Sequence, residues 1–155
     1  MSIPFSIRIP FIEQIGCELQ RFDSGHAEIS LMLNDEHTNS FGVAHGGLVM
    51  TMLDVSMAHA ARSLYLHLPD GGPALVTIEM KTTFMRPGLG RLRALGSVLH
   101  STPKMAFCEG RLLNDQDELC SHATATFKFL RALPVSGREV RHVTAHPRLS
   151  GHGSD

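Results

Sequence analysis

A long apolar segment in the middle of the chain restricts the possible fold more than any other feature. Residues 47–66 (GLVMTMLDVSMAHAARSLYL) are rich in Leu, Met and Ala and contain neither Pro nor an internal Gly, which predicts a helix of about five turns. Its apolar side chains lie on nearly every side and not on a single stripe. A helix of this kind must be buried over most of its surface, so the rest of the chain has to wrap around it.

The segments on both sides of this helix favour β-strands. A short helical turn over 10–16 precedes residues 17–22 and 26–33, which alternate around the turn Asp23-Ser24-Gly25 in the pattern of a hairpin. Four further strand-like runs are separated by connections of hairpin length, and they cover residues 74–85, 91–100, 104–113 and 118–130. This order predicts an α+β fold, with an antiparallel sheet of five to six strands wrapped around one long central helix.

The length of 155 residues fits one domain, which we assign to residues 1–133. Residues 134–155 are rich in Gly, Pro and His and lack an apolar period, so we expect a disordered C-terminal tail. His142 and His146 have a spacing that would suit a metal ion on a helix. Because neither a helix nor a third ligand is indicated there, no metal site is predicted.

Charge and composition exclude several classes of partner. Fourteen Lys and Arg residues against 15 Asp and Glu give a formal charge of −1, which supplies no reason to expect nucleic-acid binding. The longest nearly charge-free stretch, residues 41–57, is shorter than the roughly 20 apolar residues that a membrane span needs. The N-terminus has an Arg within its apolar run and lacks the pattern of a signal peptide. We therefore expect a cytoplasmic protein without a membrane partner.

Three cysteines, Cys17, Cys108 and Cys120, agree with this compartment. They are odd in number, widely spaced and without the Cys-x-x-Cys pattern of a zinc or redox site. We interpret them as small buried hydrophobic residues in a reducing environment.

Asp54 is the only acidic residue of the predicted helix. Burial of a carboxylate costs several kcal/mol unless the group is paired, hydrogen-bonded or protonated. One interpretation is structural: Asp54 satisfies neighbouring backbone, or pairs with His59 or Arg62 at the edge of the helix. The other is functional, because strongly perturbed carboxylates are enriched at active sites.

The second candidate feature, His45-Gly46-Gly47, lies at the start of the same helix. Two residues without a Cβ let a ligand approach the backbone, and free N–H groups at the positive end of a helix suit a developing oxyanion. The alternative is that the glycines only end a loop. Asn39, earlier in this loop, could orient His45 or donate a hydrogen bond to a substrate.

Helix geometry separates these two features. Gly46 and Asp54 are eight residues apart, which is about 12 Å along a helix. One substrate carbonyl cannot contact both groups of one chain. If both serve the same reacting carbon, they must come from different chains at a two-fold interface, which implies at least a dimer.

The pattern Asn39-x-x-Gly42-x-x-His45-Gly46-Gly47, with Asp54 seven residues after the second Gly, resembles the hotdog-fold thioesterases, most closely the PaaI-like (phenylacetate-pathway) group. Residues 74–88 are similar to the strand of this family that ends in Phe-x-Arg-Pro, and residues 106–129 to its last hairpin. The resemblance covers roughly residues 10–130. It implies a hotdog fold, hydrolysis of acyl-CoA without metal or redox cofactor, and a homo-oligomer that is a dimer or a dimer of dimers.

The resemblance also implies roles for individual residues. Asp54 would activate water or attack the thioester directly, and the Gly46 N–H would polarise the thioester carbonyl from the neighbouring subunit. Asn39 and His45 would position the thioester end of the substrate. Thr77 would help to hold the water or the carboxylate.

Further residues are candidates for contact with the rest of the acyl-CoA. Gly47 would let the substrate approach the backbone. Arginine and lysine suit the phosphates of coenzyme A, and the candidates are Arg86, Arg91, Lys104 and Arg131. An apolar slot for the acyl group and the pantetheine arm would be lined by Met50, Met57, Phe84 and Met85. Solvated turn charges and ordinary core packing are the alternatives for these two groups.

Two other functions fit the same residues. A hotdog dehydratase acting on 3-hydroxyacyl chains pairs a His with an acidic residue of the helix, for which His45 and Asp54 are candidates. A non-catalytic acyl-CoA-binding module would bind the same ligand without turnover. For the hydrolase we expect an aromatic or a short- to medium-chain acyl group.

Overall fold

The structure is a computed structural model that describes residues 1–68 and 73–130 of the chain. The predicted tail over 134–155, with His142 and His146, and the candidate Arg131 lie outside these residues. The elements in chain order are α1 (Pro10–Ile15), β1 (Glu18–Asp23), β2 (His26–Met32), the 3₁₀ turn η1 (Asp35–His37), α2 (Gly46–Arg62), the 3₁₀ turn η2 (Ser63–Tyr65), β3 (Ala74–Phe84), β4 (Arg91–Ser101), β5 (Met105–Leu113) and β6 (Leu119–Leu130).

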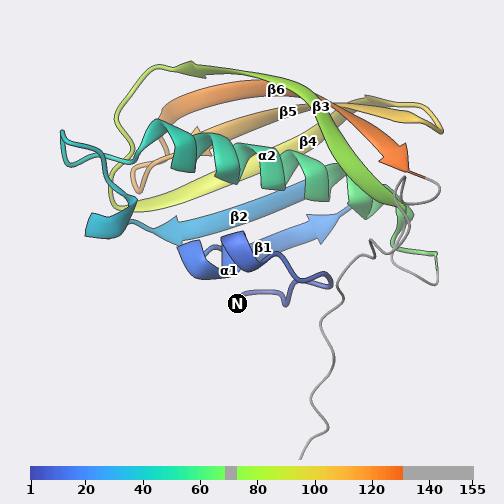
Figure 1. The fold of residues 1–155 in the computed structure, drawn as a ribbon, viewed down its shortest axis with the longest axis horizontal. Helices are drawn as coiled ribbons and strands as arrows, with labels where there is room; N and C mark the ends of the chain where they lie inside the picture. The colour runs from blue at the N-terminus through green and yellow to red at the C-terminus, as the bar shows by residue number, and fades with distance from the viewer. Residues whose placement is uncertain (69–72, 131–155) are drawn as a thin grey trace, which may run out of the picture.

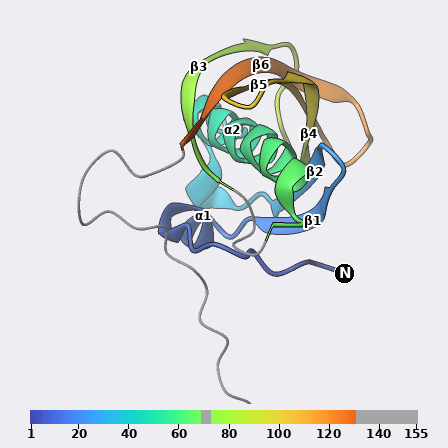
Figure 2. The same ribbon diagram turned by 90° about the vertical axis from the view of Figure 1, so that its right-hand side faces the viewer.

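One antiparallel sheet of six strands curls around α2, in the order β1-β2-β4-β5-β6-β3. Figure 2 looks nearly along α2 and shows the strands on several sides of the helix, with α1 below it. In Figure 1 the helix lies across the inner face of the sheet, and β3 crosses in front of it. The predicted antiparallel α+β architecture with one long central helix is confirmed.

The position of β3 differs from what a connection of hairpin length suggests. β3 pairs with β6 at one edge of the sheet and not with β4, which follows it in sequence. Residues 85–90 cross the end of the curled sheet, where the N–H groups of Met85 and Arg86 both donate to the Cys120 carbonyl. Because the sheet curls, this short segment is sufficient to reach β4 on the other side of β5 and β6. As a result, the inner face of β3 lies beside α2.

The predicted helix over 47–66 corresponds to α2 followed by η2. Most of its apolar side chains are buried, and Met52, Leu53 and Met57 have no exposed surface. Gly96 of β4 allows the helix to approach closely, because a Cβ there would overlap the backbone carbonyl of Ser56. In the described part of the chain, no helix combines the length and apolar character that crossing a membrane requires.

Candidate active site

The start of α2 is capped by His45. The His45 Nδ1 accepts a hydrogen bond of 2.9 Å from the Gly47 N–H, so the ring occupies the place that Ser, Thr, Asp or Asn most often takes at a helix N-cap. The Gly46 N–H has no hydrogen-bond acceptor among the residues that the structure describes. This N–H therefore remains available to a ligand at the positive end of a 17-residue helix.

An ordered loop leads to this helix start. Asn39 shapes it: its side-chain Oδ1 accepts from the Phe41 N–H at 2.9 Å and from the Val43 N–H at 3.4 Å. The backbone of Asn39 adds a bond from its N–H to the Val43 carbonyl. The side-chain oxygen of Asn39 is thus bonded to N–H groups of its own loop. Asn39 therefore stabilises the segment that carries His45.

His37 anchors the other side of this loop and was not singled out in the sequence. Its Nδ1 accepts from the Asn34 N–H at 3.1 Å, and its Nε2 lies 2.8 Å from the Ile15 carbonyl, to which it donates. The His37 carbonyl accepts from the His45 N–H at 2.9 Å. A buried histidine therefore connects the end of α1 to the residue that caps α2. No local pattern distinguishes it from the nine other histidines.

Asp54 lies two turns into α2, on its side toward β3. The Thr77 hydroxyl donates a hydrogen bond of 2.7 Å to the Asp54 Oδ1. Burial raises the pKa of the Asp54 carboxyl above its ordinary value, and the bond from Thr77 lowers this pKa in part. The structural interpretation, in which Asp54 pairs with His59 or Arg62, does not hold among the described residues. Within the part of the chain that the structure describes, Asp54 is therefore a half-buried carboxylate supported by a single neutral donor.

Gly46 and Asp54 both belong to the continuous helix α2. Their separation of eight residues places them about 12 Å apart along its axis, so the structure keeps them in two separate places of one chain. The ring of Phe84 covers the Gly46 end, since its nearest atoms lie 3.6 Å from the position that a Cβ on Gly46 would take. β3 therefore spans both ends of the candidate site, with Phe84 beside Gly46 and Thr77 beside Asp54.

The predicted apolar slot is only partly accessible. Phe84 and Met85 are about half exposed, at 53% and 48%, and Met50 is half-buried. Met57 is fully buried against Gly110 in the core and has no accessible surface for a substrate. Gly47 is exposed, but its N–H is bonded to His45.

Three of the four predicted phosphate contacts lie among the described residues, and they do not gather in one place. Arg86 donates to the Leu119 carbonyl at 2.9 Å and lies 3.6 Å from a Glu118 carboxylate oxygen. Arg91 donates to the Ser30 hydroxyl at 3.0 Å. The start of β4 lies near the start of α2, because the Ala44 N–H donates to the carbonyl of Gly88, shortly before β4. Lys104 lies in the turn after the other end of β4, and therefore at the end of the sheet opposite the start of α2. Of these three cations, only Arg86 and Arg91 lie at the same end as Gly46.

The chemistry available at the site follows from these contacts. A half-buried carboxylate with a raised pKa can accept a proton from water or attack a carbonyl carbon. An unbonded N–H at a helix start can stabilise an oxyanion. Both groups are present, but one chain holds them too far apart to act on one carbonyl.

Comparison with known proteins identifies the family. The thioesterase superfamily profile matches residues 41–121, which include His45, Gly46, Asp54 and Thr77. The Escherichia coli K12 protein named medium/long-chain acyl-CoA thioesterase YigI is 26% identical over 135 residues, covering 79% of this chain and 87% of the relative.

Two solved structures have the same architecture. The conserved protein PA5202 from Pseudomonas aeruginosa is 28% identical, with a TM-score of 0.73, covering 81% of this chain and 97% of that one. The E. coli PaaI protein from the phenylacetic acid degradation operon is 20% identical, with a TM-score of 0.69, covering 77% and 83%. The resemblance inferred from the motif at 39–54 is confirmed, and the chain belongs to the thioesterase superfamily, with the hotdog fold.

Proposed function

We propose that this protein is an acyl-CoA thioesterase, which hydrolyses a thioester to a free acid and coenzyme A. The observation that carries the proposal is Asp54, the single acidic residue of α2, held by Thr77 in a partly buried position that raises the pKa of its carboxyl. Membership of the thioesterase superfamily supports this reaction. The names of two relatives suggest medium- or long-chain acyl-CoA and phenylacetate-type substrates, so the candidates include aromatic as well as aliphatic acyl groups.

The reaction needs a partner subunit in this proposal. Asp54 takes a proton from water, and the resulting hydroxide attacks the thioester carbonyl carbon. The oxyanion is stabilised by the N–H of Gly46 of the partner subunit. When the tetrahedral intermediate collapses, the C–S bond breaks, and the proton held by Asp54 passes to the departing thiolate. In the alternative route Asp54 attacks the carbonyl carbon directly, the C–S bond breaks as the anhydride forms, and the thiolate departs. Water then opens the anhydride, which gives the free acid, restores the Asp54 carboxylate and supplies the proton for the thiolate.

The sheet edge supports an assembly of at least two copies. β3 is an edge strand that pairs only with β6 among the described residues, and its side chains Val76 and Ile78 are 41% and 53% exposed. A long edge strand with exposed apolar side chains is a template for pairing with another chain. Two copies joined there, with their α2 helices antiparallel, would place Gly46 of each beside Asp54 of the other. We extend this proposal to a dimer of dimers, and to a cytoplasmic location, with which three free buried cysteines agree.

His45 favours hydrolysis over dehydration as the reaction. Its Nδ1 accepts the Gly47 N–H to cap α2, so the neutral ring carries its proton on Nε2, and that nitrogen cannot take a proton from a 3-hydroxyacyl substrate. The hydrolase proposal needs no such proton transfer.

The test is thiol release from an acyl-CoA panel (acetyl, hexanoyl, phenylacetyl, benzoyl and palmitoyl) by the full chain and by Asp54→Asn. Asp23→Asn, an exposed carboxylate of the β1–β2 hairpin, is the matched control. We expect Asp54→Asn to lose about a hundredfold or more in kcat/KM while the control retains activity. If the folded native protein releases thiol from none of these thioesters, the proposed function is contradicted and binding without turnover is favoured.

A further inference from the structure

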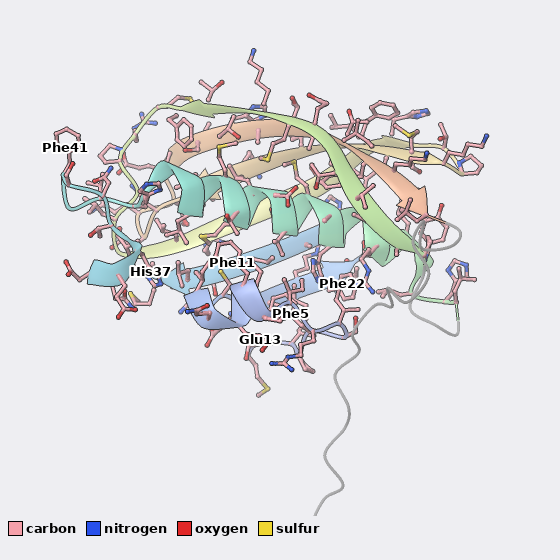
Figure 3. The ribbon with its side chains drawn as sticks, in the orientation of Figure 1. Phe5, Phe11, Glu13, Phe22, His37 and Phe41 are labelled. Carbon is pink, nitrogen blue, oxygen red and sulfur yellow. The ribbon has the colours of Figure 1, made fainter. Side chains whose placement is uncertain are left out.

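Phe41 is an unusually exposed aromatic residue close to the start of α2. Its side chain is 87% exposed, more than that of any other phenylalanine among the described residues. Figure 3 shows it at the tip of the loop that extends beyond the N-terminal end of α2. Isolated exposed apolar residues are common, so exposure alone assigns no role to Phe41.

The backbone that carries Phe41 is held in one conformation by several bonds. The Phe41 N–H donates to the Asn39 side chain, the Gly42 N–H to the Asn39 carbonyl at 3.0 Å, and the Asn39 N–H to the Val43 carbonyl at 2.9 Å. Gly42 takes a φ of +73°, which favours glycine at this turn. A large apolar ring is thus presented to solvent on an ordered loop, five residues before the unbonded N–H of Gly46. This order means that a contact with Phe41 would carry little entropic penalty.

The loop direction excludes a contact between Phe41 and Asp54 of the same chain. Asp54 lies eight residues into the helix from Gly46, whereas Phe41 lies beyond the helix start on the other side (Figure 3). In the proposed dimer the two α2 helices run antiparallel, and Gly46 lies beside Asp54 of the partner subunit. The segment before Gly46 then continues along the C-terminal half of the partner helix, toward Ala58 of the partner subunit. Ala58 follows Asp54 by one helical turn, or about 6 Å, on the same face of α2.

We propose that Phe41 is a specificity-determining residue that acts across the subunit interface, where its ring forms a wall of the acyl site beside the partner's Asp54. This inference rests on the proposed function. The half-buried side chains that α2 offers there, Val55 and Ala58, are apolar, and so is Phe41. The two amides of the pantetheine arm would lose their hydrogen bonds in such surroundings, whereas an acyl chain would not. The acyl portion is therefore the part of the substrate that Phe41 contacts.

This position predicts a dependence on acyl length. An acetyl group ends next to the thioester carbonyl and does not reach the ring, whereas longer chains extend past Asp54 and bury surface against it. Removal of the ring should weaken the binding of long chains and leave short chains unaffected.

The test compares Phe41→Ala and Phe41→Leu with the native chain. Phe107→Ala is the matched control, because Phe107 is an exposed phenylalanine that stacks on His100 of the neighbouring strand β4, away from the start of α2. Calorimetry measures Kd for non-hydrolysable ketone analogues of acetyl-, hexanoyl- and dodecanoyl-CoA, so that the result does not depend on turnover. Sedimentation of each variant reports the oligomeric state, and kcat/KM is measured with the matching thioesters.

We expect Phe41→Ala to raise Kd for the dodecanoyl analogue about tenfold more than for the acetyl analogue, with Phe41→Leu intermediate and Phe107→Ala unchanged. An equal effect at all lengths, no effect, or dissociation of the oligomer with a uniform loss would each overturn the inference. If the native chain hydrolyses the thioesters but Phe41→Ala keeps the native length dependence, the inference fails and the proposed function stands. If the native chain binds the analogues without hydrolysing the thioesters, the proposed function fails, and the Kd values still decide the role of Phe41. A native chain that neither binds nor hydrolyses overturns both.

Discussion

The Thr77 hydroxyl on edge strand β3 donates a hydrogen bond of 2.7 Å to Asp54 on the central helix. This bond acts on the Asp54 carboxyl in the opposite direction to burial, because burial raises its pKa and the bond favours its charged form. The two residues are 23 positions apart in the sequence, and they meet because β3 lies at the free edge of the sheet beside α2. Thr77 is therefore a positioning residue that also tunes the group it holds.

Replacement of Thr77 by Val removes this bond while the side-chain shape is kept. The pKa of Asp54 then rises further, so the acidic limb of the kcat/KM profile should move to higher pH. We expect kcat/KM at neutral pH to fall about tenfold, the effect of losing one hydrogen bond to a charged group. Thr77→Ser should restore the native profile. An unchanged acidic limb in Thr77→Val would show that the bond does not act on the group that titrates in catalysis.

His45 caps α2, so its replacement should act on stability. In His45→Ala the Gly47 N–H loses its acceptor, and we expect the free energy of unfolding in urea to fall by about 1 kcal/mol. Asparagine is a favourable N-cap residue, so His45→Asn should retain most of the native stability. Equal losses in both variants would contradict the capping role.

The close approach of α2 to β4 predicts a large effect at Gly96. A Cβ at this position would overlap the Ser56 carbonyl and lie 2.7 Å from the Met57 nitrogen, so the helix must shift. We expect Gly96→Ala to lower the free energy of unfolding by about 3 kcal/mol. Ser97→Ala, the next residue, points to the other face of the sheet and should change stability little. Similar thermal midpoints for the two variants would contradict this packing.

His59 predicts how the protein responds to acid. Burial, and then the nearby Arg62, lower the pKa of its imidazole from 6.5 to about 4. Its ring makes edge contacts with Phe5 and Phe22, whose positions under the C-terminal half of α2 appear in Figure 3. The folded state favours the neutral ring, so this contribution to stability is fully present above pH 6.5 and is lost as the pH falls toward 4.

The loss between these pH values amounts to about 3 kcal/mol for this one residue. His59→Phe cannot titrate, so its free energy of unfolding should fall less than that of the native chain over this range. The measurement is urea unfolding at a series of pH values. Parallel curves for the two proteins would show that His59 does not account for the acid sensitivity.

The sequence predicted the features that depend on local periodicity. The apolar run with Asp54 is α2, and the alternating runs are strands, because burial repeats every 3.6 residues in a helix and every second residue in a strand. The separation of Gly46 and Asp54 within one chain also followed from helix rise alone.

Other features depend on which elements meet, which one-dimensional patterns do not determine. The hairpin-length connection after β3 concealed the pairing of β3 with β6. Met50 and Met57 look alike in the sequence, but only Met57 faces the sheet at Gly110 and is fully buried. The contact of Thr77 with Asp54 was expected only from the family resemblance, since no spacing rule connects a strand to a helix 23 residues away.

A mixed-oligomer experiment tests most directly the claim that Asp54 of one subunit acts with Gly46 of another. Gly46→Pro removes the N–H, and proline suits the first position of a helix; His45, with φ −61° and ψ 135°, already has the conformation that a following proline requires. Asp54→Asn removes the carboxylate. Each variant alone should be inactive in acyl-CoA hydrolysis.

The two inactive variants are then reassociated in equal amounts, and thiol release is measured. In a mixed dimer one site carries both changes, and the other site carries neither. With random pairing, about one quarter of the native activity should be recovered. If mixed oligomers form but remain as inactive as the separate variants, Gly46 and Asp54 do not act across the interface.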